Sequence, residues 1–186
     1  MCHGPPHAAF LLDAVIGQRL VVGMVPDLET LDETLMQTAL AEARNAASVD
    51  EVPIGALIFD PSSKTVVATG QNAPISLNDP CAHAEIQALR ATGQAIGNYR
   101  LGGLWLYVTL EPCAMCAGAI SHARIERLIY GASDPKGGAV EHGPRFFEQP
   151  TCHWRPQVTS GVLAEDSRVM LQSFFKARRK LKSTDD

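Results

Sequence analysis

The sequence has no uninterrupted apolar run that approaches the roughly 18 residues needed to span a membrane. Its first basic residue is Arg19, so its start does not have the basic opening of a secretory signal, and we expect none. Internal repeats and low-complexity segments are also missing. These absences argue against a membrane protein and against a repeat array.

Cysteine is scarce, and the five cysteines are an odd number without the spacing of a small secreted disulfide scaffold. A reducing compartment fits this usage best, so we expect a cytoplasmic protein. With 186 residues and 46% hydrophobic composition, the chain is long enough for one domain with a real core. It is too short for two ordinary domains.

Basic residues are few in the first part of the chain and concentrated at its end. The net charge of −4 taken alone argues against a nucleic-acid partner. Residues 1–50 contain two basic and seven acidic residues, whereas residues 168–182 contain six basic and no acidic ones. A phosphate backbone responds to the local patch, so the end of the chain favours RNA contact. A basic but merely solvated helix face is the alternative.

Two short segments, His83-Ala84-Glu85 and Pro112-Cys113-Ala114-Met115-Cys116, carry a pattern of metal ligands. Cysteines three apart lie on the same side of a helical turn, and the proline before them favours a helix that begins there. A catalytic zinc takes three protein ligands and leaves its fourth position to water. The pattern therefore predicts one zinc per chain, bound by His83, Cys113 and Cys116.

Glu85 is then left close to the metal but free to carry protons. The pattern H-x-E followed by P-C-x-x-C is the known signature of zinc-dependent nucleobase deaminases, and it agrees here at every fixed position. We therefore predict hydrolytic deamination, with Glu85 as the general acid and base.

Other interpretations of the same residues remain open. Cys81 could complete a closed structural zinc site as a fourth ligand. The Cys-x-x-Cys segment could be a redox pair, although His83 and Glu85 would then have no role.

Longer stretches of the chain resemble the bacterial tRNA-specific adenosine deaminases. The similar stretches are Asn72-Ala73-Pro74, Asp79-Pro80, residues 82–86, 98–101, 106–113 and 115–120, Phe174-Phe175 and Arg178-Arg179. The likeness as a whole covers roughly residues 31–182, which is most of the chain. The resemblance implies conversion of the wobble adenosine of a tRNA anticodon to inosine. It also implies a homodimer in which each active site is completed by its neighbour.

The resemblance further implies a set of substrate contacts. Asn72 would hydrogen-bond the base, the Ala84 amide would contact the purine, and Asp134 would lie near the flipped nucleotide. Phe175, Arg178 and Arg179 would belong to the surface that binds the anticodon stem-loop. By itself, Asn72 would first be interpreted as a turn-capping residue.

The sequence also departs from the family. Cys81 replaces a small hydroxyl residue, Ser133 stands where some members have Arg, and residues 139–154 diverge most. Three rival functions follow. A free-base or nucleoside deaminase acting on guanine or cytosine would not need the basic end. A riboflavin-pathway deaminase would need a longer cysteine spacing, and a non-catalytic, zinc-stabilised RNA-binding module would give Glu85 no role.

Periodicity and turn residues predict the order of the elements. Helices are expected at 31–47, 113–122 and 164–182. A further helix is expected to begin at a cap formed by Asp79 and Pro80 and to stop at Gly93. Strands are expected at 52–59, 65–70, 104–109, 127–130 and 158–162. Residues 131–157 are expected to form a loop with one helical turn at 145–148. The strand-helix-strand alternation implies a parallel crossover in a layered α/β domain.

The resemblance implies the cytidine-deaminase-like fold, a three-layer α/β/α arrangement around a five-stranded mixed sheet. Residues 24–182 are expected to form the deaminase domain. Residues 1–23 match nothing in the family and are expected to be an N-terminal extension, and residues 183–186 a tail.

Overall fold

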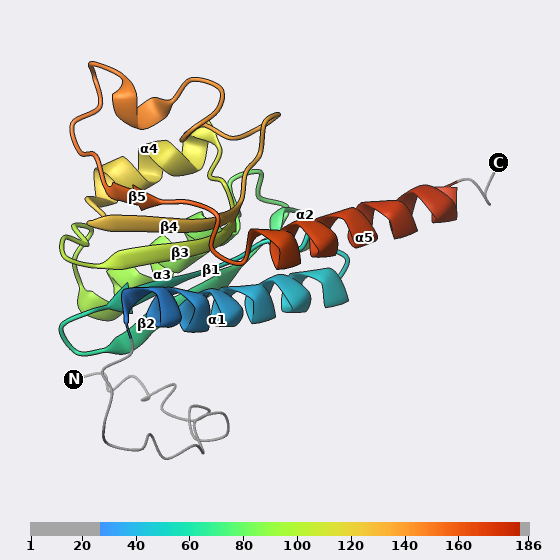
Figure 1. Ribbon diagram of the computed structural model, residues 1–186, viewed down its shortest axis with the longest axis horizontal. Helices are drawn as coiled ribbons and strands as arrows, with labels where there is room; N and C mark the ends of the chain where they lie inside the picture. Colours follow the sequence, from blue (N-terminus) through green and yellow to red (C-terminus); the bar gives the residue numbers. More distant parts are fainter. Residues whose placement is uncertain (1–26, 183–186) are drawn as a thin grey trace, which may run out of the picture.

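The computed structural model describes residues 27–182, with side chains as far as residue 180. The expected extension at 1–23 and the expected tail at 183–186 lie outside this range. The elements, in chain order, are α1 (Leu28–Ser48), β1 (Gly55–Asp60), β2 (Thr65–Gln71), α2 (Pro74–Leu77), α3 (Ala84–Ile96), β3 (Trp105–Leu110), α4 (Ala114–Ala123), β4 (Arg127–Ala132), the 3₁₀ turn η1 (Phe146–Glu148), β5 (Gln157–Thr159) and α5 (Ala164–Lys182) (Figure 1).

The strands form one mixed sheet in the order β2-β1-β3-β4-β5. β1 is antiparallel to β2 and β3, whereas β4 is parallel to both β3 and β5. The crossover from β3 through α4 to β4 is the predicted parallel connection. Because β3 and β4 are parallel, their carboxyl ends meet at one edge of the sheet, where Leu110 pairs with Ala132.

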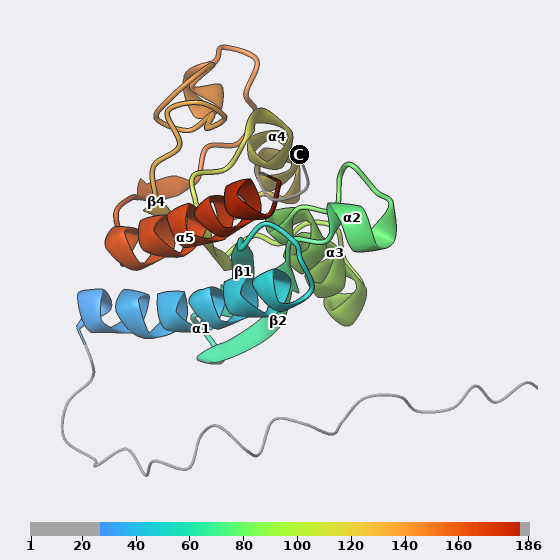
Figure 2. The ribbon, with the colours of Figure 1, turned by 90° about the vertical axis from the view of Figure 1, so that its right-hand side faces the viewer.

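Helices cover both faces of the sheet, which gives the expected three layers. Alternate residues along each strand point to opposite faces. In β1, Ile58 packs with the α3 and α4 side of the core, and Leu57 packs with the α1 side. Figure 2 shows α1 and α5 running alongside each other on that second face. Within residues 27–182, no helix is both long and apolar enough to cross a membrane.

A buried ion pair joins α1 to the second face of the sheet. The carboxylate of Asp32 accepts hydrogen bonds from both terminal guanidinium nitrogens of Arg127, at 2.7 and 2.6 Å. The same carboxylate accepts the Tyr107 hydroxyl at 2.7 Å. Burial and this bond to Asp32 raise the pKa of Tyr107. The network satisfies each charge with its partner, as buried charges require.

The helix that begins near the first motif was predicted wrongly at both ends. The Asp79 carboxylate does not cap it but accepts the Cys81 amide at 2.8 Å, which forms a turn before the helix. The helix starts at Ala84 and continues past Gly93 to Ile96. It stops at Gly97, whose φ of 65° is the left-handed conformation typical of a helix end.

The short helix α2 was not predicted. It is four residues long and depends on a tertiary contact. The buried carboxylate of Glu51 accepts the Ile75 amide at 2.9 Å and the Ser76 amide at 2.7 Å, both at its N-terminus. Nothing local in the sequence connects Glu51 with residues 24 and 25 positions further on.

Candidate active site

His83, Cys113 and Cys116 meet at the N-terminal ends of α3 and α4. Their ligand atoms all lie within 4.8 Å of one another, and they form the only such group of His, Cys, Asp or Glu side chains in the part of the chain that the structure describes. His83 Nδ1 lies 3.7 Å from Cys113 Sγ and 3.6 Å from Cys116 Sγ. Nδ1 is therefore the imidazole atom that faces the metal position. Cys81 does not belong to the group, which disfavours a closed four-ligand site.

The helix starts explain how residues 30 or more positions apart come together. His83 is the N-cap of α3 and Cys113 the N-cap of α4, so both have extended backbones and side chains free of the helix. Cys116 lies one turn further along α4, on the side of Cys113. Gly70 lets the first turn of α3 approach β2, because a Cβ there would lie 2.3 Å from the Ala84 carbonyl oxygen.

The two sulfurs have opposite proton affinities. Hydrogen bonds from the Cys116 thiol and from His83 lower the pKa of Cys113 to about 4. The thiol hydrogen bond to Cys113, burial and the charge of Glu85 raise the pKa of Cys116. Cys113 therefore loses its proton much more readily than Cys116, and a divalent cation bound here would displace the Cys116 proton as well. This donor set fits zinc, which prefers thiolate and imidazole ligands.

Glu85 lies in the first turn of α3 and is buried, with 4% of its surface exposed. Burial is the main cause that raises its pKa, and the negative charge of Cys113 adds to it. A carboxyl group with a raised pKa can hold and release a proton near neutral pH. Glu85 is not part of the ligand group, so it is available for proton transfer.

Asn72 and Ala84, two of the expected base contacts, lie close to this group in the chain. Asn72 follows β2 and is 5% exposed. Its backbone amide donates to the Ile54 carbonyl oxygen at 3.0 Å. Its side-chain Oδ1, in contrast, is buried without a hydrogen-bond partner among the described residues. Ala84 is the first residue of α3, and the first amides of a helix have no partner within the helix. Both positions provide polar groups that a base could use.

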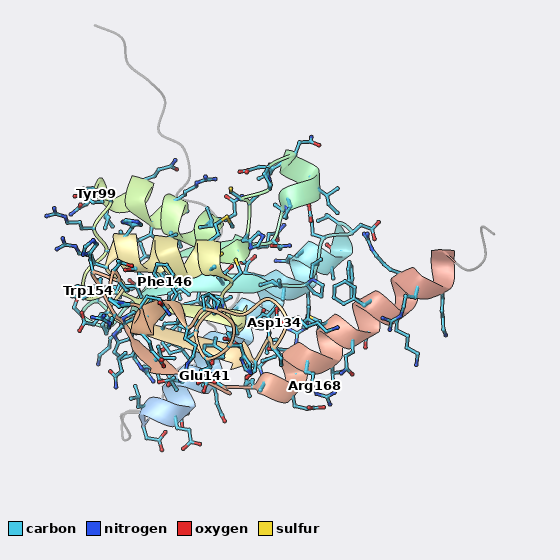
Figure 3. All side chains as sticks on the ribbon, turned by 90° about the horizontal axis from the view of Figure 1, so that it is seen from above. Tyr99, Asp134, Glu141, Phe146, Trp154 and Arg168 are labelled. Atoms are coloured by element: carbon cyan, nitrogen blue, oxygen red, sulfur yellow. The ribbon has the colours of Figure 1, made fainter. Side chains whose placement is uncertain are left out.

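Asp134, labelled in Figure 3, lies in the loop that follows β4, at the sheet edge where β3 also ends, shortly before Cys113. Its Oδ1 accepts the Lys136 amide at 3.0 Å, so its carboxylate holds a tight turn. Ser133, where some relatives have Arg, immediately precedes it and offers no cation.

Glu111 lies directly before the Pro-Cys-x-x-Cys segment, but no local pattern in the sequence indicated a role for it. It is 2% exposed and accepts several backbone amides from the loop after β4. The sequence did indicate that Glu111 must have partners, because a carboxylate at the end of a buried strand is rarely left unpaired. What those partners are could not be derived from the sequence.

The expected RNA-contacting residues lie in the C-terminal half of α5, and the end of this helix extends beyond the sheet (Figure 1). Phe175 is 43% exposed and Arg179 is exposed. Arg178 is half-buried, pairs with Asp50 at 3.3 Å, and lies 4.9 Å from the centre of the Phe174 ring. Arg178 is therefore partly used within the protein, which the sequence did not predict.

Comparison with known proteins agrees with the site. Residues 29–132 match the family described as the cytidine and deoxycytidylate deaminase zinc-binding region. The chain is 56% identical over 145 residues to a tRNA-specific adenosine deaminase of Agrobacterium fabrum, covering 77% of this chain and 93% of that protein. It also matches a solved structure from a study of A-to-I editing by tRNA:A34 deaminases at the wobble position of transfer RNA. That match has 55% identity and a TM-score of 0.72, and covers 74% of this chain and 99% of the other.

A guanine deaminase of Bacillus subtilis has the same fold but is more distant. It is 29% identical with a TM-score of 0.52, and the match covers 80% of this chain and 93% of that one. The three-layer fold and the His83, Cys113 and Cys116 zinc site thus define a zinc-dependent deaminase of the cytidine and deoxycytidylate deaminase class. Within that class, the chain belongs to the tRNA-specific adenosine deaminase family.

Proposed function

We propose that this protein is a zinc-dependent enzyme that deaminates the wobble adenosine of a tRNA anticodon to inosine. The observation that carries the proposal is Glu85, a buried carboxylate with a raised pKa that lies beside three zinc donors and is not one of them. Membership of the tRNA-specific adenosine deaminase family supports adenosine as the substrate.

The proposed reaction replaces the C6–N6 bond of adenine with a C6–O bond and releases ammonia. Zinc, when bound by His83, Cys113 and Cys116, supplies the Lewis acidity that makes hydroxide available near neutral pH. Glu85 accepts one proton from the attacking water and donates it to ring N1. It then accepts the second proton, from the new C6 hydroxyl group, and donates it to N6, which leaves as ammonia. The raised pKa of Glu85 suits both directions of transfer.

Base recognition is assigned to the neighbouring polar groups. Asn72 Oδ1 is a buried acceptor without a partner among the described residues, so it is available to a donor on the substrate. An unpaired buried oxygen costs stability, and a ligand that pairs it recovers that cost. The Ala84 amide and Asp134 are proposed as further contacts to the flipped nucleotide.

The anticodon stem-loop is assigned to the outer part of α5. Phe175 offers an exposed ring for stacking on an unpaired base, and Arg179 offers an exposed cation for phosphate. Arg178 can contribute from its position beside Phe174.

The four cysteines of the described range form no disulfide, which supports action in the reducing cytosol.

A homodimer is proposed from the face that α3 and α4 expose. An apolar groove of about 410 Å³ runs between these helices, lined by Ile86, Leu89, Ala119 and Ala123 among others. Tyr99 stands at its rim with 69% of its surface exposed. Figure 3 shows Tyr99, Phe146 and Trp154 at the same end of the molecule. A second copy would cover this surface, and the mass in solution at micromolar concentration tests it.

The direct test of function is inosine formation in tRNA transcripts that carry an anticodon adenosine. The wild-type protein should convert them, and Glu85→Ala should not, although it binds zinc equally. Rapid turnover of free guanine or cytosine, without activity on the transcripts, would support the free-base rival instead.

A further inference from the structure

Glu111 is bound to the loop after β4 through both of its carboxylate oxygens. Oε1 accepts the amides of Val140 at 3.1 Å, Glu141 at 2.9 Å and His142 at 3.0 Å. Oε2 accepts the amide of Asp134 at 2.9 Å and lies 2.7 Å from His142 Nδ1. One buried side chain therefore holds the first and last residues of the segment 134–142. Figure 3 shows Asp134 and Glu141, which belong to the two ends of this segment.

The same segment is attached to the backbone of the zinc motif. Glu111 immediately precedes Pro112 and Cys113, and its amide donates to the Ala132 carbonyl at 2.8 Å. The Ala139 amide donates to the Pro112 carbonyl at 2.9 Å. Segment 134–142 thus lies against the turn that carries a zinc ligand.

Gly138 lets the segment close over the carboxylate. A Cβ at this position would lie 2.4 Å from Glu111 Cδ and 2.6 Å from the Asp134 carbonyl oxygen. The Asp134 oxygen belongs to the backbone, and the Glu111 carboxylate is held in place by its hydrogen bonds from four amides, so an alanine would push the segment away from Glu111. The close packing is therefore specific to glycine here.

This edge of the sheet is where substrate is expected, because ligands of α/β proteins bind outside the carboxyl ends of parallel strands. We propose that Glu111 is a positioning residue that holds segment 134–142 as one wall of the substrate pocket. Glu111 does not touch the substrate itself; it acts through Asp134 and the neighbouring backbone. The inference rests on the proposed function for its substrate.

Two variants test the anchor, and the second of them separates the two ends of the segment. Glu111→Ala removes all the acceptors. Glu111→Gln keeps an oxygen that can serve Val140, Glu141 and His142, but turns an NH₂ group toward the Asp134 amide, where two donors then face each other. In the glutamine variant, hydrogen exchange at the Asp134 amide should rise about tenfold or more, while exchange at residues 140–142 rises less.

The kinetic constants should report the same loosening of segment 134–142. For an anticodon stem-loop carrying adenosine, Glu111→Gln should raise KM about tenfold with little change in kcat, since the wall that holds the nucleotide has loosened. Gly138→Ala should give the same pattern through a different residue. Zinc content should remain at the wild-type level in both variants, because no ligand has changed.

Tyr107→Phe is the matched control for a merely structural role. It removes a buried hydrogen bond to Asp32 on the other face of the sheet and should lower the melting temperature without changing KM. His142→Ala removes only the side-chain contact to Glu111 and should raise KM less than Glu111→Gln does.

The outcomes separate this inference from the proposed function. If wild-type protein converts no adenosine, the proposed function fails, while the amide exchange of the metal-loaded protein still tests the anchor. If Glu111→Gln loses zinc, the positioning role is wrong. It is also wrong if Glu111→Gln and Tyr107→Phe lower the melting temperature equally and have the same KM. Unchanged exchange at Asp134 would also overturn it.

Discussion

The zinc edge of the sheet and the outer end of α5 are built in opposite ways. At the zinc edge the functional groups are buried or half-buried, fixed by helix starts, and shifted in their proton affinities. At the end of α5 they are mostly exposed, and the ribbon of this helix extends beyond the sheet (Figure 1). The first region can lower an energy barrier because its groups are preorganised in a site shielded from water. The second can only attract and hold a large anion.

The largest effect is expected from the loss of a metal ligand at the zinc edge. Cys113→Ser should reduce zinc far below one ion per chain and lower activity by more than about 10⁴, because both the metal and the groups around it are disturbed. Elemental analysis and single-turnover inosine formation measure this. Cys152→Ser is the control, because Cys152 is a buried thiol outside the zinc group and its loss should leave zinc content unchanged. Normal zinc in Cys113→Ser would remove Cys113 from the ligand set.

Glu85→Ala tests the chemistry apart from the metal. It should keep zinc and fold but lower kcat by about 10² to 10⁴, near the upper end because one carboxylate serves several proton transfers. Zinc analysis, circular dichroism and kcat on a tRNA transcript are the measurements. Activity within threefold of wild type would eliminate Glu85 as the proton carrier.

Changes at the end of α5 should affect binding more than chemistry. Replacing Arg178, Arg179 and Lys180 by Gln should weaken RNA binding and lower the slope of log Kd against log salt by about 0.7 for each phosphate that is no longer neutralised. The change in kcat at saturating RNA should be small. Fluorescence anisotropy at several salt concentrations measures the slope.

Arg168→Gln is the matched control on the same helix. Arg168 lies in the first part of α5 and pairs with Glu165 at 2.5 Å, so it is a cation whose partner is within the protein (Figure 3). An equal effect of Arg168→Gln on the salt slope would show that general charge, not the outer end of α5, governs binding. Arg178 also pairs with Asp50, so its replacement adds a stability loss of at most about 1 kcal/mol.

The smallest expected effect concerns the N-cap of α1, far from both regions. Hydrogen bonds from the Thr30 hydroxyl and amide lower the pKa of Asp27 below its usual 3.8. The stabilisation is therefore present above that value and is lost as pH falls through the lower pKa of the folded state. Asp27→Asn still caps but does not titrate, so the Tm of wild type relative to this variant should fall as the pH is lowered through and below about 3.8. A constant difference would contradict the assignment.

The elements that could be predicted are those with a local cause. The apolar period of residues 31–47 predicted α1, and the structure extends it by only three residues at the start and one at the end. The cysteines three apart predicted the start of α4 to within one residue. Helix α3 was predicted less well, because Asp79 and Pro80 have the composition of a cap but form a separate turn.

The choice of metal and the division of charge along the chain follow from the sequence itself, because thiolate and imidazole are the ligands that zinc prefers wherever they are brought together. The pKa shifts of Cys113 and Glu85 were decided by the tertiary structure, because they arise from burial and from neighbouring groups. Only the tertiary structure decided that Glu111 binds a segment 23 to 31 residues further along, since such hydrogen bonds depend on how β3 and β4 pair. It also decided that Arg178 meets Asp50 across 128 residues. Local sequence patterns do not predict such contacts, because burial and long-range pairing arise only when the strands and helices pack together.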